Sequence, residues 1–336
     1  EVSYRYYASF AVALGEGEIT GLGRIWADGE EWDLTNVAYR LHSGSETQAP
    51  DPLIEAYLGS GNTPAYRGTA YIVFERLPLE PFGNRLPQLS FEVFRSIDDF
   101  QKEVRGVVII PGSGEFVYAT KPVEREEFGG EFVAENVHTR EAATNWSASL
   151  DQLARTLPNV TSASLITCWF GNDLRAGDCL VRPGVERDEK VTRPRNWRVA
   201  GLSRSQAYVV SKDAGRPAYG GTPSDDSVIE AIADLKARGI KPVLTPFLLM
   251  DVPAGNTLPD PWTGGAGQPA YPWRGRLTVE PAPGRPGSPD KTAAAGSQVA
   301  AFVGTAAVSD FSIVAGNVVY SGPAEWSYRR FILHYA

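Results

Sequence analysis

The chain has 336 residues, of which 43% are hydrophobic, and its formal net charge at pH 7 is −8. This hydrophobic fraction is typical of folded domains and excludes global disorder. The negative charge argues against nonspecific binding to nucleic acid or to an anionic membrane surface. No stretch reaches the roughly 18 apolar residues that a membrane span requires, so we expect no membrane span.

The first third of the chain is predicted to be all-β. Alternating residues from Val2 to Ala13 indicate a long strand, and the next apolar stretch runs into Asp28-Gly29, a strong hairpin signal. Further strands are predicted at 39–42, 71–75 and 89–94. We therefore assign residues 1–104 to a β-rich domain.

Residues 105–160 form a mixed segment that connects two domains. Strands are predicted at 107–110 and 115–118, and a helix at 145–157. Asn145 is the expected N-cap of that helix, because its side chain can accept a hydrogen bond from a free backbone N–H of the first turn.

From Ser164 onward the pattern becomes that of an α/β domain. The apolar run 165–170 is typical of a strand that is buried on both faces. A helix capped by Ser224 ends near Gly239, and a second apolar strand follows at 242–249. Together they predict a βαβ unit with parallel strands.

The end of the chain predicts the start of another helix. A helix is expected at 291–303 and two short strands near Phe311 and Val318. Pro323 to Ala336 then read as the opening of an amphipathic helix with the proline in its first turn. We expect residues 161–336 to be the N-terminal, incomplete part of a larger α/β domain, and the sequence, which lacks an initial methionine, to be a piece of a longer protein.

Cysteine and histidine spacing predicts no metal site and no cofactor. Cys168 and Cys179 fit no zinc or redox motif, and a buried free thiol is favoured over a disulfide. The three histidines lie far apart in the sequence and none has a partner at ligand spacing.

Candidate chemistry lies at the carboxyl ends of the two predicted parallel strands, where such domains place their sites. Trp169, Asn172 and Asp173 follow the first strand and Asp251 the second. The two aspartates could form a carboxylate pair for glycoside hydrolysis. The stronger interpretation is that they cap turns by accepting backbone hydrogen bonds.

Three aromatic residues lie on the long loop that follows: Trp262, Tyr271 and Trp273. Their rings could stack on sugars, or they could anchor a loop that otherwise lacks a core, and both interpretations stay open. The candidate glycan-contacting residues are therefore Trp169, Asn172, Asp173, Asp251, Trp262 and Trp273.

Several stretches together resemble one family of proteins. The stretches are 13–19 with 25–29, 44–52, 66–71 with 82–87, 166–175 and 326–336. In this order they resemble the tail-hub proteins of long-tailed bacteriophages and of gene transfer agents, which carry a TIM-barrel-like domain related to glycoside hydrolases. The resemblance covers nearly the whole chain and implies an α+β protein: a β-rich tail-hub module followed by the first part of a TIM-barrel-like (β/α) domain.

The resemblance also implies a function. The protein would be a structural hub at the tail tip of a phage-like particle, a homotrimer that contacts the distal tail protein and other tail-tip proteins. Its barrel domain would face cell-wall glycan during envelope penetration, with DNA passing only in transit during ejection, and particles would assemble in the bacterial cytoplasm. Alternatives are a glycoside hydrolase or a carbohydrate-binding host-recognition module. The family's glutamate motif follows a third strand, so any catalytic residues are expected outside this chain.

Overall fold

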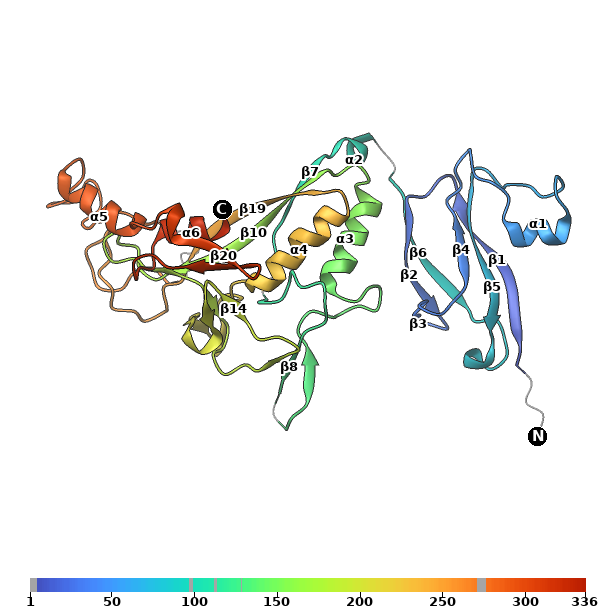
Figure 1. The fold of residues 1–336 in the computed structure, drawn as a ribbon, viewed down its shortest axis with the longest axis horizontal. Coiled ribbons are helices and arrows are strands. Elements are labelled where there is room, and N and C mark those ends of the chain that lie inside the picture. The colour runs from blue at the N-terminus through green and yellow to red at the C-terminus, as the bar shows by residue number, and fades with distance from the viewer. Residues whose placement is uncertain (1–4, 97–98, 112–113, 128, 271–275) are drawn as a thin grey trace. The chain divides into compact units, whose positions relative to one another are not determined.

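The computed structural model describes residues 5–96, 99–111, 114–127, 129–270 and 276–336, and it is a mixed α+β structure (Figure 1). It contains two compact units. The β-rich unit comprises Glu1–Arg105 and His138–Val160, and the α/β unit comprises Gly106–Val137 and Thr161–Ala336. The predicted connecting segment 105–160 is thus divided between the two units.

The β-rich unit contains two antiparallel three-stranded sheets. The first has the order β1 (Tyr7–Glu16), β5 (Thr69–Pro78), β4 (Tyr39–His42), and the second β3 (Glu30–Glu31), β2 (Gly21–Ala27), β6 (Leu89–Phe94). Ala27 pairs with Glu30 across Asp28-Gly29, which confirms the predicted hairpin. Four buried apolar side chains form the core: Ile25, Ile72, Phe74 and Leu77.

The helices of this unit show where the sequence prediction was incomplete. Helix α1 (Pro52–Leu58) was not predicted. The unit also contains a 3-10 turn at Glu80–Phe82 and helix α2 (Asp99–Glu103), which were not predicted either. Helix α3 (Asn145–Thr156) was predicted, but its N-cap is Thr144, whose hydroxyl accepts from the Ser147 N–H. Asn145 is instead the first helical residue, and its carboxamide accepts from the His138 N–H at 2.8 Å.

Asp51 caps α1 with a carboxylate that has no exposed surface. It accepts hydrogen bonds from Arg40 Nε at 2.7 Å, from His42 Nε2 at 2.9 Å and from the Leu53 N–H at 2.9 Å. Burial alone would raise the pKa of Asp51, but the hydrogen bonds from Arg40 and His42 hold this pKa well below its ordinary value. The ionised form is therefore favoured in the folded state.

This lowered pKa predicts an acid-sensitive β-rich unit. A carboxyl group with a depressed folded-state pKa contributes stability above its unfolded pKa of about 4, and this stability is lost as the pH falls toward the folded value. We expect hydrogen-exchange protection of β4 and β5 to fall between about pH 5 and pH 3, the range set by that ordinary pKa. The loss should be smaller in Asp51→Asn and unchanged in Glu80→Gln, an exposed carboxylate in the same unit. An identical pH profile in Asp51→Asn would contradict this role.

The α/β unit is built on a four-stranded sheet. The central strand β10 (Ser162–Gly171) pairs in parallel with β19 (Lys241–Met250), from Ser162 opposite Lys241 to Gly171 opposite Met250. On its other edge β10 pairs with β7 (Gly106–Ile109) and β11 (Val181–Arg182). Helix α4 (Asp225–Ala237) connects the parallel strands, with Ser224 as its N-cap (Figure 1). The predicted βαβ unit is confirmed, whereas a closed barrel is not formed by the described residues and stays a prediction.

Side chains complete the edge of β10 that faces away from β19. β7 pairs with its first residues and β11 with its last. Between them, Tyr118 Oη donates to the Ile166 carbonyl at 2.8 Å, and Thr222 Oγ1 donates to the Cys168 carbonyl at 2.8 Å. A buried carbonyl without a donor is destabilising. These two buried hydroxyls therefore supply hydrogen-bond donors to β10 carbonyls at positions where no strand pairs with this edge.

The outer edge of β19 has no strand partner among the described residues. The Lys241 N–H donates to the Thr161 carbonyl, so the odd-numbered residues of β19 point their N–H groups toward β10. Pro242 and Pro246 occupy even-numbered positions, whose backbone faces outward, and proline has no N–H to donate. The first half of this edge therefore cannot support a regular ladder.

Shorter elements make up the rest of the α/β unit. Short pairs are β8 (Glu124–Glu126) with β9 (Phe132–Ala134) and β13 (Thr192–Arg193), β12 (Gly184–Val185) with β16 (Tyr208–Val209), β14 (Arg198–Val199) with β15 (Leu202–Ser203), and β17 (Lys212–Asp213) with β18 (Arg216–Pro217). The C-terminal part holds α5 (Ala293–Val303), β20 (Phe311–Val314), β21 (Asn317–Tyr320) and α6 (Tyr328–Tyr335), with 3-10 turns at Arg204–Gln206 and Val308–Asp310.

Two local predictions in this unit were wrong. Residues 115–118 form turns instead of a strand. The last helix begins at Tyr328, after the N-cap Ser327, and not at Pro323. The Ser327 hydroxyl accepts from the Arg330 N–H, which supplies the helix start that the proline was expected to give.

Within the described residues, the structure has no helix that is both long and apolar enough to cross a membrane.

Candidate functional site

The carboxyl ends of β10 and β19 lie side by side, because Gly171 pairs with Met250. Asp173, just after β10, is 3% exposed. Its Oδ1 accepts from the Arg175 N–H at 2.8 Å and from Gln268 Nε2 at 2.7 Å, and its Oδ2 pairs with Arg175 Nη2 at 2.7 Å. Asp173 therefore holds a turn and pairs with an arginine, as the capping interpretation predicts.

Asp251, just after β19, is completely buried. Its Oδ2 accepts from Tyr208 Oη at 2.8 Å and from the Ser211 N–H at 2.7 Å, and its Oδ1 accepts from the Ser211 hydroxyl. Burial raises the pKa of Tyr208, and the Asp251 charge raises it further, so Tyr208 stays a donor to this carboxylate. Asp251 thus ties residues 208–211 to the end of β19.

These contacts decide what the two carboxylates can do. A glycosidase needs one carboxyl group that reaches the glycosidic oxygen and another that reaches a water molecule or the sugar. Both aspartates are enclosed, and all four of their oxygens accept hydrogen bonds from the protein. The predicted catalytic pair is therefore corrected to two structural acceptors.

The prediction that Trp169 contacts glycan is also corrected, because its side chain is fully buried and no face of the ring is open to a sugar. It packs against Trp326, Phe331 and His334, with ring centroids 5.7, 5.2 and 5.6 Å away, and its indole N–H donates to Tyr335 Oη at 3.3 Å. This cluster attaches α6 to β10. Trp169 is part of the core, as its position in an apolar strand indicates.

The remaining candidates differ in exposure. Asn172 is partly buried, and its Oδ1 accepts from the Leu180 N–H at 2.9 Å. Trp262 is 43% exposed, and its indole N–H donates to the Arg276 carbonyl at 3.1 Å. Trp273 and Tyr271 lie outside the described residues. Glycan contact stays a prediction for Asn172, Trp262 and Trp273.

Sequence reasoning missed a buried ionic network in the α/β unit. Glu115 has no exposed surface, and its two oxygens pair with Arg204 Nη1 at 2.9 Å and Nη2 at 2.7 Å. Lys190 Nζ contacts Glu115 at 3.1 Å, Glu135 at 3.1 Å and Glu186 at 3.0 Å. No local sequence signal could have placed Glu115 in this network, because Glu115 is 75 residues from Lys190 and 89 residues from Arg204.

The network keeps its members charged. Burial alone would raise the pKa of Glu115, but the Arg204 hydrogen bonds and the Lys190 charge lower it. Burial alone would lower the pKa of Lys190, and the three surrounding carboxylates raise it instead. A buried charge is tolerated only with such pairing. The arrangement fixes the segment 186–204 against Glu115 and offers no free group for catalysis.

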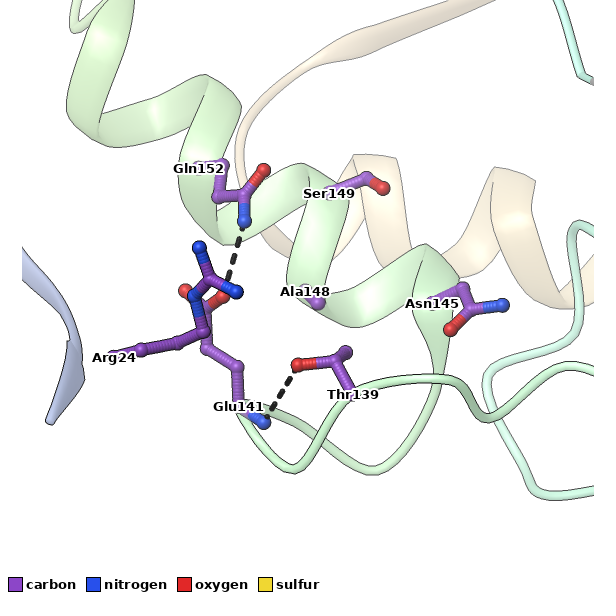
Figure 2. Close-up of a pocket in the computed structure, with 7 residues that line it drawn as sticks. All are labelled: Arg24, Thr139, Glu141, Asn145, Ala148, Ser149 and Gln152. Atoms are coloured by element: carbon purple, nitrogen blue, oxygen red, sulfur yellow. Dashed lines mark hydrogen bonds between the residues drawn. The ribbon is translucent and has the colours of Figure 1, made fainter. Parts of the chain in front are cut away.

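A separate polar pocket of about 280 Å³ lies in the β-rich unit (Figure 2). Its lining residues are Arg24, Thr139, Glu141, Asn145, Ala148, Ser149 and Gln152. Glu141 accepts from Gln152 Nε2 at 3.0 Å and from Arg155 Nη1 at 2.6 Å, and Arg24 pairs with Glu92 at 3.0 Å. The charged groups are therefore already paired, and the pocket presents polar groups without a nucleophile and base in contact.

The described residues contain no group of three or more histidine, cysteine or acidic side chains that could hold a metal ion. Cys168 and Cys179 are free thiols, as predicted. Burial raises the pKa of Cys179 to about 11, so this thiol is unreactive at neutral pH.

Part of the chain is similar to a solved structure. No family model matches the chain, and no curated protein matches it. A chain in the structure described as the virion of a native gene transfer agent (GTA) particle is 46% identical over 29% of this chain and 23% of that chain, with a TM-score of 0.26. The match thus spans about a quarter of the length of that virion chain.

Proposed function

We propose that this chain is a structural component of a phage-like particle, a tail-tip hub protein that connects the tail tube and the distal tail protein to a cell-wall-facing domain. The structural role is supported above all by the burial and the hydrogen bonding of Asp173 and Asp251. Both carboxylates follow the carboxyl ends of parallel strands, where a (β/α)-barrel hydrolase would place its catalytic groups, and both are buried and fully used in internal hydrogen bonds. The resemblance of the quoted stretches to tail-hub proteins supports the particle context.

The β-rich unit supports an assembly role in physical terms. Its strand β1 is ten residues long and lies at the edge of its sheet. The outward residues Ser9, Ala11 and Ala13 are small and uncharged, so they leave this backbone edge open to a neighbouring subunit. A homotrimeric ring would use such edges. The net charge of −8 would keep passing DNA from binding to the ring.

Particle imaging tests this proposal. Antibodies against the chain, applied to purified particles and viewed by electron microscopy, should label one end of the tail, and deletion of the gene should give particles without a tail tip. An antibody against a head protein serves as the control. Protein found free in the cytosol and absent from purified particles would refute the proposed role.

The exposed ring of Trp262 favours carbohydrate binding as a second function. A glycoside hydrolase would need catalytic carboxylates beyond those of this chain. Release of fragments from peptidoglycan by a longer protein, lost when those carboxylates are replaced, would establish the enzyme, whereas glycan binding without release would leave recognition alone.

A further inference from the structure

The hairpin of β20 and β21 carries a cluster of exposed apolar side chains on the α/β unit. Ile313 is 72% exposed, Val314 55% and Val319 41%. The two strands pair only with each other among the described residues. A two-stranded sheet has little stability of its own in water, and clustered exposed apolar side chains mark an interaction surface. The hairpin is therefore a candidate surface for a partner.

The base of this hairpin is attached to the rest of the unit. The Ser321 N–H donates to the Asp310 carbonyl at 2.9 Å, and Tyr320 Oη donates to the Pro323 carbonyl at 2.9 Å. The Arg330 guanidinium lies 4.1 Å from the centre of the Tyr320 ring, within the range of a cation–π contact. The exposed strands are thus positioned before any partner arrives, which lowers the entropic cost of binding.

Backbone pairing within the hairpin determines which groups of β20 face outward. Val314 pairs with Asn317 across a two-residue turn, and hydrogen-bonded pairs alternate along an antiparallel ladder. Ser312 therefore also bonds to β21, whereas the N–H and C=O groups of Ile313 point away from it. No strand pairs with this outer edge in the part of the chain that the structure describes. Ile313 therefore offers a donor and an acceptor to another strand.

Neither strand of the hairpin has a residue that would block such pairing. β20 and β21 contain no proline and no charged side chain. The outward side of β19, in contrast, is interrupted by Pro242 and Pro246. An exposed apolar edge without charge or proline pairs readily with a further strand. The edge of β20 is therefore open to pairing, unlike that of β19.

The charge distribution favours a second copy of this chain as the partner. Two copies with a net charge of −8 each repel one another, so contact between them requires a surface without charge. Residues 311–322 contain no charged side chain, and the preceding Asp310 is engaged through Oδ2 by the Ala307 N–H at 2.8 Å. A lipid bilayer could cover the apolar side chains, but it would leave the backbone groups of Ile313 without hydrogen-bond partners.

We propose that β20 pairs with β20 of a second copy in an antiparallel arrangement, in which the Ile313 N–H of each copy donates to the Ile313 carbonyl of the other. A twofold axis between identical strands uses the same groups on both copies. The result is a four-stranded sheet of order β21-β20-β20-β21, with the two Ile313 side chains side by side on one face. The interface lies in the α/β unit, so the proposal goes beyond the proposed function and does not depend on pairing through β1.

Sedimentation velocity of the purified full chain, at concentrations from about 1 μM to about 1 mM, measures this association. We expect the molar mass of Ile313→Pro to be half that of wild type at the highest concentration. Proline removes the outward donor from both copies but leaves the hydrogen bonds of Ser312 and Val314 to β21. The expected halving is the same whether the pairing unit is one chain or a ring of chains. An equal mass of both proteins across this range would overturn the proposal.

Further variants separate the backbone contact from loss of folding. Ile313→Asp keeps the N–H but places like charges opposite each other, so it should also halve the mass. Ile313→Thr keeps the donor and the β-branched shape, so it should retain the wild-type mass at the highest concentration. Val108→Asp is the matched control, because Val108 is 60% exposed on strand β7 of the same unit. Equal masses of Ile313→Asp and Val108→Asp would contradict the role of the hairpin.

Flotation with phosphatidylcholine vesicles tests the bilayer as the alternative partner. These vesicles carry no net charge, so they neither attract nor repel the acidic chain. We expect wild type to remain in the dense fraction together with Ile313→Asp. Flotation of wild type that is lost in Ile313→Asp would show that the hairpin inserts into lipid, and it would overturn the assignment to a second copy.

Discussion

Replacing Glu115 by glutamine is expected to lower the free energy of unfolding of the α/β unit by about 3–5 kcal/mol. Glu115 accepts two hydrogen bonds from Arg204, one from Lys190 and one from the Glu186 N–H, and none of its surface is exposed. Glutamine keeps the volume but turns an NH₂ group toward these cations. Arg204 would then lose its Glu115 carboxylate partner, and Lys190 would lose one of its three.

Hydrogen exchange of β10 and of residues 186–204 would measure this loss, because it reports the α/β unit separately from the β-rich unit. The control is Arg85→Ala, which breaks an ion pair with Asp28 in which both side chains are substantially exposed. Exposed pairs contribute only about 0–1 kcal/mol. A Glu115→Gln variant with the same protection as Arg85→Ala would show that the network does not hold this unit together.

Trp169→Ala should destabilise the same unit by about 3–5 kcal/mol, the usual cost of removing a large buried ring. The ring has no exposed surface and contacts four rings of the C-terminal region, those of Trp326, Phe331, His334 and Tyr335. Its removal leaves a cavity between β10 and α6 that these rigid rings cannot fill. We expect α6 to lose its protection first, because Phe331, His334 and Tyr335 of this helix contact the Trp169 ring.

Trp262→Ala is the matched comparison, since it removes the same side chain from an exposed position. It should change the free energy of unfolding by less than about 1 kcal/mol. Thermal unfolding followed by near-ultraviolet circular dichroism distinguishes the two variants. Comparable losses in Trp169→Ala and Trp262→Ala would contradict the assignment of Trp169 to the core and of Trp262 to the surface.

The parts of the fold that depend on local pattern could be predicted from the sequence. The parallel strands and α4 follow from apolar runs, the Ser224 cap and a terminal glycine, all of which act within a few residues. Helix α1 was missed although its signals are present, since Asp51 is a good N-cap and Pro52 suits the first turn. None of its seven residues is buried, so the segment lacks the buried apolar stripe that indicates a packed helix.

The site could be predicted only in part. The turn-capping interpretation of Asp173 was correct, because the adjacent N–H groups of its own loop are local partners. The partner of Asp251 at Tyr208 and the Glu115 network join residues brought together by folding, which a one-dimensional pattern does not contain. Trp169 was assigned to glycan contact from its position near a strand end, although the apolar run around it indicated burial.

The two prolines on the outward side of β19 have a consequence for solubility of the chain. An apolar strand with an open edge is a template on which a second copy can add its own strand, and such pairing propagates into aggregates. Pro242 and Pro246 remove two donors from that edge, so a second copy finds an interrupted row of groups instead of a continuous one. They act as gatekeepers that allow a strand to stay this apolar without self-association.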